Sequence, residues 1–426
     1  MSKTTERVKA GLAKRYARER RFRAFGLTSI ILSMVFLGIL LLSIFSNGLP
    51  AFTQTYVRLH VDLSEETLGV NSSAPEDKLR FADYAGVINK SLSERFPGVT
   101  ERRQRKDLRQ LVSGNAQYRL QNLVLADPTL IGTQQTVWFL ADDDIDTYFK
   151  GNIDRTLPEA ERRIKDHQLK WLDDLEAAGD IEKRFNTVFF TTGDSREPEQ
   201  AGILGALMGS FYTMLVTLSL SFPIAVAAAI YLEEFAPKNN PFVDFIEVNI
   251  NNLAAVPSIV FGLLGLAVFI QFFGVPRSTP LVGGLVLTLM TLPTIIIASR
   301  AALKAVPPSI REAALGMGAS RVQTVFHHTL PLAMPGILTG TIIGMAQALG
   351  ETAPLLMIGM IAFIIDIPGG ITDPAAALPV QIYLWSDSPE RAFTEKTSAA
   401  IIVLLFFLIM MNLLAVLLRK KFERRW

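Results

Sequence analysis

Long apolar runs alternate with polar stretches along this chain, and they dominate its second half. A helix of about 20 apolar residues crosses the hydrocarbon core of a bilayer, which is about 30 Å thick. Six runs reach this length and predict six transmembrane helices in an all-α polytopic membrane protein. They lie at approximately Phe25–Ser46, Gly202–Leu232, Leu253–Phe273, Leu281–Ser299, Met334–Ile365 and Ser398–Leu418.

A polar insertion separates the first apolar run from the second and predicts a small α+β domain. Its segment Leu49–Glu199 carries 20 Lys/Arg against 26 Asp/Glu. Alternating polar and apolar positions and short β-rich runs indicate strands, whereas longer polar stretches of good helix formers indicate helices. We expect strands at Tyr56–Leu63, Thr136–Leu140 and Thr187–Thr191, and helices at Pro75–Phe96, Glu101–Leu111 and Glu159–Ala178.

Basic residues beside the spans predict their orientation, because Lys and Arg concentrate in short cytoplasmic segments. Nine Lys/Arg residues precede the first run, and the tail 419–426 is basic as well, so both ends are expected in the cytoplasm. The first run lacks the small residues of a signal-peptide cleavage site and is expected to remain as an anchor. A polar insertion of this length translocates regardless of its charge and is expected outside. The loop Glu233–Glu247 is acidic although this topology places it inside.

Composition excludes several classes of chemistry. The chain has no cysteine and only four histidines, with no HExxH pattern, so no metal site is expected. It lacks a GxxxxGK[ST] loop, and no cluster of nucleophile, base and acid suggests a catalytic site. We therefore expect no cofactor and no enzyme activity in this chain, and its energy must come from a partner or a gradient.

The segment between the fourth and fifth runs carries the most specific motif. It reads Glu312-Ala313-Ala314, three residues, Gly318, nine residues, His328, one residue, and then Leu330-Pro331. This spacing resembles the EAA loop of ABC-importer permeases, which docks on a separate ATPase, except that His328 stands where that loop has an apolar residue. The alternative is an amphipathic loop lying on the surface between two spans.

Local signals predict how this coupling loop folds. Ser309 is a plausible N-cap, and Glu312 would then lie in the first turn, where a negative charge suits the helix dipole. Gly318 permits a sharp turn. A second short helix, Ser320–His328, is expected to end near Pro331. The result would be a helix–turn–helix suited to a groove in another protein.

Three further segments indicate which family of permeases this chain resembles. They are Ala227-Ala228-Ala229-Ile230-Tyr231-Leu232-Glu233-Glu234, Ala254-Ala255-Val256-Pro257-Ser258-Ile259-Val260-Phe261-Gly262-Leu263 and Gly350-Glu351-Thr352-Ala353-Pro354-Leu355-Leu356. Together they are similar to the PstA family, the A-type permeases of phosphate-specific ABC transporters. The resemblance implies the type I ABC-importer permease fold, a multi-pass place in the bacterial inner membrane, and import of phosphate by alternating access.

The same resemblance implies partners and a domain plan. The partners would be a homologous second permease in a heterodimer, two ATP-binding cassette ATPase subunits that hydrolyse the ATP, and a periplasmic phosphate-binding protein, with no nucleic acid. The expected plan is a basic cytoplasmic segment 1–24, an anchor helix 25–46, a periplasmic domain 47–199, a permease domain 200–418 with the coupling loop at 300–331, and a basic tail 419–426.

Two other functions remain open. One is an ABC permease for another oxyanion or a small solute. The other is a membrane sensor that uses the outer domain, which the short stretch after the last run disfavours.

Glu351 is the main candidate for the translocation pathway, because ionisable residues deep in a span are costly and usually functional. Gln347 lies one helical turn earlier on the same face, and Arg300 ends the fourth span, where it could line an exit for anions. The alternative for Glu351 is a single interhelical hydrogen bond. Small residues near its helix face would let another helix approach closely; they are Gly340, Gly344 and Gly350.

Overall fold

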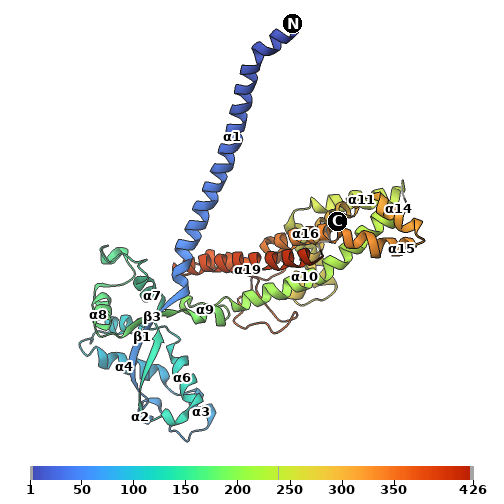
Figure 1. The fold of residues 1–426 in the computed structure, drawn as a ribbon. Helices are drawn as coiled ribbons and strands as arrows, with labels where there is room; N and C mark the ends of the chain where they lie inside the picture. Colours follow the sequence, from blue (N-terminus) through green and yellow to red (C-terminus); the bar gives the residue numbers. More distant parts are fainter. Residues whose placement is uncertain (1–2, 238, 423–426) are drawn as a thin grey trace.

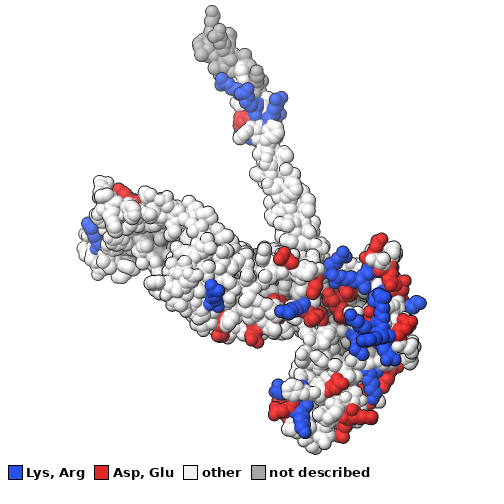
Figure 2. Space-filling view, turned by 180° about the vertical axis from the view of Figure 1, so that it is seen from behind, with Lys and Arg blue, Asp and Glu red and all other residues white. Residues whose placement is uncertain are grey.

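The chain folds into a helical bundle and a smaller domain built on a sheet, as the computed structural model in Figure 1 shows for residues 3–237 and 239–422. The first helix, α1 (Lys3–Gly48), projects from the junction between these two parts. Charged side chains crowd onto the sheet domain, and the surface of the bundle is largely uncharged (Figure 2). This division follows the polar insertion and the apolar runs of the sequence.

Five helices among the described residues are long and apolar enough to cross a membrane, and a bent helix pair could form a sixth crossing. The predicted class, a mostly helical membrane protein with a small sheet domain, is thus confirmed. The five candidate spans are Arg15–Phe52, Leu204–Phe235, Pro280–Lys304, Arg321–Gly350 and Ala392–Lys421. They overlap α1, α10 (Leu204–Ile230), α13 (Pro280–Lys304), α16 (Leu330–Gly350) and α19 (Ala392–Phe422).

The third apolar run is a bent pair rather than one straight helix, which corrects the expected span Leu253–Phe273. The chain bends by 105° between helix α11 (Pro241–Ala254) and the segment Ser258–Phe272. That segment comprises α12 (Ser258–Leu264) and the π-helical turn η6 (Gly265–Phe272). Pro257 lies at the bend and begins α12 as its N-cap. A proline disfavours helical backbone in the residue before it, so the helix stops there.

The fifth apolar run is also broken, which corrects the expected span Met334–Ile365. The helix begins earlier, at Arg321, and ends at Gly350. A short helix, α17 (Ala353–Met357), follows. Pro354 has no N–H for the carbonyl of Gly350, and its ring would clash with that carbonyl in a continuous helix. The chain therefore leaves the helix at Glu351, whose backbone is extended (φ −77°, ψ 122°).

The sheet domain contains a three-stranded antiparallel sheet in the order β2-β1-β3. The strands are β1 (Thr53–Asp62), β2 (Gln134–Leu140) and β3 (Ile181–Phe185). The strand expected at Thr187–Thr191 is wrong, because this segment is the helix α9, capped by Asn186, whose side chain accepts a hydrogen bond of 2.9 Å from the backbone N–H of Phe189.

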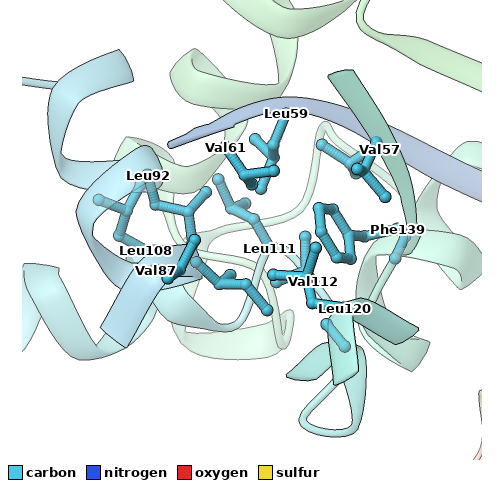
Figure 3. Packing of buried hydrophobic residues seen from close by; sticks show 14 of the residues in the cluster. Val57, Leu59, Val61, Val87, Leu92, Leu108, Leu111, Val112, Leu120 and Phe139 are labelled. Carbon is cyan, nitrogen blue, oxygen red and sulfur yellow. The ribbon is translucent and has the colours of Figure 1, made fainter. Parts of the chain in front are cut away.

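Helices cover one face of the sheet and build the core of the domain (Figure 3). Val57, Leu59 and Phe139 from the sheet pack with Leu111 and Leu120, and all five are buried. The expected helix Pro75–Phe96 is two helices, and the expected helix Glu159–Ala178 begins later, at Asp166. The helices of the domain are α2 (Glu65–Leu68), α3 (Glu76–Arg80), α4 (Tyr84–Arg95), α5 (Arg102–Arg109), α6 (Ala116–Ala126), α7 (Asp143–Phe149) and α8 (Asp166–Ala177).

Candidate functional site

The coupling loop lies at the end of the bundle opposite the sheet domain, where Figure 1 places α11, α14 and α15. Its first helix, α14, runs Pro308–Gly316. The N-cap of α14 is Pro307, so the expectation that Ser309 is the N-cap is wrong, and Glu312 lies beyond the first turn. Gly318 has a φ of +86°, a left-handed conformation that glycine adopts without strain, and it makes the predicted sharp turn.

The second half of the loop is continuous with a span, which corrects the expected short helix Ser320–His328. Ser320 begins α15 (Arg321–Gln323) with a capping box in which its side chain and that of Gln323 each bond the other's backbone N–H. The helix continues through the π-helical turn η7 (Thr324–Thr329) into α16. Leu330 and Pro331 therefore lie within a continuous helix, at the point where the π-helical turn passes into α16.

The loop presents an apolar surface at the tip of the bundle. Glu312 and Ala313 are exposed, whereas Ala314 is only 8% exposed and faces inward. Exposed apolar patches mark sites of protein or membrane contact. The exposed large apolar side chains of the loop, with their exposed fractions, are Leu315 (47%), Met317 (89%), Val322 (55%) and Phe326 (51%). His328 is exposed beside them.

Ion pairs fix this loop to the neighbouring helices. The Arg311 side chain on α14 donates to Glu234, with an Nη2–Oε1 distance of 2.7 Å. Glu234 belongs to the π-helical turn η5 (Tyr231–Phe235) that ends α10. Arg300 on α13 bonds Glu247 on α11 at 2.5 Å, and Glu233 lies within 4 Å of both Arg300 and Lys304.

These pairs explain the acidic loop that disagreed with the charge rule. Its Glu233 and Glu247 neutralise basic residues of the next loop instead of standing alone. Sequence reasoning missed Arg311 and the three glutamates as functional candidates. The acidic loop was the signal, because acids at a boundary that favours Lys and Arg imply local partners. Arg300 is paired in this way, and its role in an anion exit stays a prediction.

Glu351 lies at the break between α16 and α17 and not inside a span, which corrects its predicted position. Ala348, just before the break, lines the same small cavity as Leu287 of α13, and α13 extends beyond Leu287 as far as Pro280. The break is therefore within the length of the bundle. Glu351 is half-buried, and its side chain has no hydrogen bond to any described residue. Gln347, one turn earlier, is exposed on the chain surface.

The two broken segments pack against each other. A Cβ on Gly262 of α12 would lie 2.8 Å from Pro354 and 2.9 Å from Met357 of α17. Irregular backbone at membrane depth is tolerated only where protein buries it or a water-filled cavity borders it. The segments that follow the two helix breaks are thus buried against each other, and the predicted role of Glu351 in the translocation pathway stays a prediction.

Glycines set the distance between α13 and α16. A Cβ on Gly340 would lie 2.2 Å from Cβ of Ala298, and one on Gly344 would lie 3.3 Å from Ile295. A Cβ on Gly336 would likewise lie 2.6 Å from Cβ of Ala302. Gly350 does not belong to this contact, because its Cβ would find no neighbour among the described residues within 4 Å. Its predicted packing role stays a prediction.

Comparison with known proteins finds two family matches along the chain. Residues 221–426 match the family described as binding-protein-dependent transport system inner membrane component. Residues 9–159 match a domain of unknown function (DUF3333).

Curated relatives are ABC transporter permeases. A probable ABC transporter permease protein of Bacillus subtilis is 37% identical over 39% of this chain and 56% of its own length. The phosphate transport system permease protein PstA of Mycobacterium leprae is 33% identical over 46% of this chain and 64% of its own length. PstA of Haemophilus influenzae is 30% identical over 47% of this chain and 69% of its own length. The chain thus spans about half to two thirds of the length of these relatives.

A solved structure, an inward-facing MetNI methionine ABC transporter, matches 51% of this chain and 95% of its own at 18% identity, with a TM-score of 0.43. The apolar helices, the motif loop and the family match together define a membrane permease component of the binding-protein-dependent transport class. Within that class, the chain belongs to the PstA family of phosphate transport permeases.

Proposed function

We propose that this chain imports inorganic phosphate across the inner membrane by alternating access, driven by a separate ATPase. The exposed coupling loop carries the proposal that a partner supplies the energy, because it combines the EAA spacing with an apolar surface at the tip of the bundle. The cargo is supported by relatives whose names are phosphate transport permeases.

The proposed assembly contains three kinds of partner protein. A phosphate transport permease PstC of Haemophilus influenzae is 30% identical over 42% of this chain, which supports a homologous second permease in a heterodimer. Two ATP-binding cassette subunits would dock on the coupling loops, and a phosphate-binding protein would deliver cargo on the outer side. This arrangement requires both termini and α14 in the cytoplasm and the sheet domain in the periplasm.

The proposed coupling surface combines the motif residues with their exposed neighbours. Met317 and Leu315 would enter the ATPase groove, and Ala313 would let the two surfaces approach closely. Gly318 shapes the turn, whereas Ala314 faces inward and fits α14 against the bundle. Glu312 is exposed and available for a polar contact with the ATPase.

The proposed translocation site lies at the break that carries Glu351. An ionised carboxylate alone would repel phosphate, so Glu351 needs a compensating group. It would either pair with a cation of the second permease or accept a proton from a phosphate hydroxyl, and the pairing role fits a side chain that has no partner within the described residues of its own chain. Gln347 would add a neutral hydrogen-bonding group one turn away.

Phosphate uptake by vesicles that contain the whole complex tests this proposal. Uptake should require ATP and should fall sharply in Glu351→Gln, because the substitution removes the charge and keeps the shape. Asp387→Asn is a matched control, since Asp387 is exposed in the segment before α19 and outside the break. Unchanged uptake in Glu351→Gln would leave Glu351 as a packing residue, and absence of ATP-dependent uptake in the unmodified complex would contradict the proposed function.

A further inference from the structure

Arg311 uses its whole guanidinium group to tie α14 to two other helices. Its Nε and Nη2 donate to both carboxylate oxygens of Glu234, at distances between 2.7 and 3.2 Å. Its Nη1 donates to the backbone carbonyl of Val306 at 2.7 Å, and its Nη2 to that of Leu303 at 2.8 Å. A planar group held by several acceptors resists rotation, so α14 cannot tilt without moving the end of α10 or of α13.

The neighbouring pairs extend this connection to α11. Glu233, next to Glu234 in the same π-helical turn, lies 3.7 Å from the Nε of Arg300. The same guanidinium bonds Glu247 of α11 through Nη2. The Arg300 side chain is 16% exposed and that of Glu234 is 9% exposed, so water screens these pairs less than it screens pairs at an open surface.

Helix α11 leads from these pairs to the broken region. It ends at Ala254, where the chain bends by 105° into α12, and α12 packs on α17 through Gly262. Helix α17 follows directly after Glu351. A continuous series of packed elements therefore runs from the coupling loop to the candidate translocation site. π-helical turns such as η5 are frequent at functional sites, and Glu233 and Glu234 both lie in one.

We propose that Arg311, Glu234, Glu233, Arg300 and Glu247 form a transmission joint that passes movement of the coupling loop to the broken pair α11–α12. This inference rests on the proposed function, because it requires an ATPase that moves the loop. The five residues act as positioning residues in this joint, and the joint requires none of them to touch phosphate or ATP. Each glutamate is paired with a cation on another helix, so that movement of one helix displaces the other. Loss of one pair should therefore uncouple ATP hydrolysis from transport and leave docking of the ATPase intact.

The test measures ATP hydrolysis and phosphate uptake together in the reconstituted complex. Glu234→Gln and Glu247→Gln should keep ATP hydrolysis but lower the phosphate imported per ATP by about fivefold to tenfold. The double variant Arg311→Glu with Glu234→Arg should recover part of the lost import per ATP, because it restores an ion pair with the two charges exchanged. Arg321→Gln is the control, since Arg321 is exposed in the same loop.

Crosslinking at Met317→Cys in each variant separates transmission from folding of the loop. The proposal expects crosslinking to the ATPase at the level of the unmodified complex. An unchanged amount of phosphate imported per ATP in both glutamine variants would overturn the proposal. Loss of the crosslink together with loss of uptake would also overturn it, because the ion pairs would then only hold the loop in shape. Arg311→Lys keeps the positive charge but loses the planar guanidinium group with its several donors. It should lower the phosphate imported per ATP even where the glutamine variants fold poorly. Absence of ATP-dependent uptake before any substitution would instead contradict the proposed function.

Discussion

Lys150 of the sheet domain donates a hydrogen bond of 2.7 Å to Glu395 at the start of α19. Its ammonium also lies 2.6 Å from Asp146, one turn earlier on α7. The Lys150 side chain is only 6% exposed. Nearby, Lys396 donates to the carbonyl of Ala201 just before α10. The sheet domain is therefore joined to the membrane bundle by buried charges and does not hang from a flexible linker.

Replacing Lys150 by Met should loosen this junction. Removal of one partner leaves the carboxylates of Asp146 and Glu395 buried without their cation, which costs about 3–5 kcal/mol for buried pairs. Hydrogen exchange of α7 in the full chain should become faster, with α10 unaffected. Lys170→Met, at an exposed position of α8, is the control. Equal exchange in Lys150→Met and the unmodified chain would mean that the pair does not hold the domain.

The junction should become less stable as pH rises. Burial raises the pKa of Glu199 from 4.5 to about 7, although its bond from Ser113 acts in the opposite direction. The folded chain then binds a proton more tightly than the unfolded chain, so stability is lost between pH 4.5 and about 7. Burial beside Asp143 likewise raises the pKa of Asp142, to about 8, with the same sign.

Hydrogen exchange of residues 197–201 measures this loss. Protection should decrease by about 2 kcal/mol between pH 5.5 and pH 8, after correction for the intrinsic exchange rate. Glu199→Gln keeps the hydrogen-bonding shape and should remove the share of the dependence that Glu199 contributes. A variant with the same pH dependence as the unmodified chain would exclude Glu199 as its source.

Gly340→Ala should weaken the contact between α13 and α16, because the new Cβ would lie 2.2 Å from that of Ala298. Overpacking of this kind costs about 1–3 kcal/mol. The added substitution Ala298→Gly should restore thermal stability in detergent, since it removes the clashing atom. Gly350→Ala is the control, because its position is open. Similar melting temperatures for Gly340→Ala and Gly350→Ala would contradict this packing.

Exposure in the coupling loop predicts which positions crosslink. A cysteine at Met317 should react with one in the ATPase groove, because this side chain is 89% exposed. A cysteine at Ala314 should react poorly, since that position faces the bundle. Thiol labelling of the isolated chain verifies that both variants are folded. Strong crosslinking at Ala314 and none at Met317 would require a different docking face.

The sequence predicted the features that one strong local signal determines. Apolar length located the spans, alternation located β1, and a short run of strand-forming residues located β2, because each outcome depends on several residues of one type. Apolar length alone predicted unbroken spans at Pro257 and after Gly350, because the apolar runs continue through both places, where a single proline outweighs hydrophobicity. The segment Thr187–Thr191 has strand-forming residues, yet Asn186 caps it as a helix.

The candidate site shows the same limit. The spacing from Glu312 to Pro331 predicted the coupling loop, but no spacing rule connects Arg311 with Glu234 or Arg300 with Glu247. Those pairs depend on how α10, α11, α13 and α14 meet in space. Glu351 was identified correctly as an ionisable residue in an apolar region, and its position at a helix break became visible only in three dimensions.

The central claim is that this permease moves phosphate at the expense of ATP hydrolysed by a partner. Uptake of radiolabelled phosphate by vesicles that contain the complete complex tests it most directly, with unlabelled phosphate, sulfate and a neutral solute as competitors. We predict uptake that requires ATP and is suppressed only by unlabelled phosphate. Uptake without ATP, or equal suppression by sulfate, would contradict the claim.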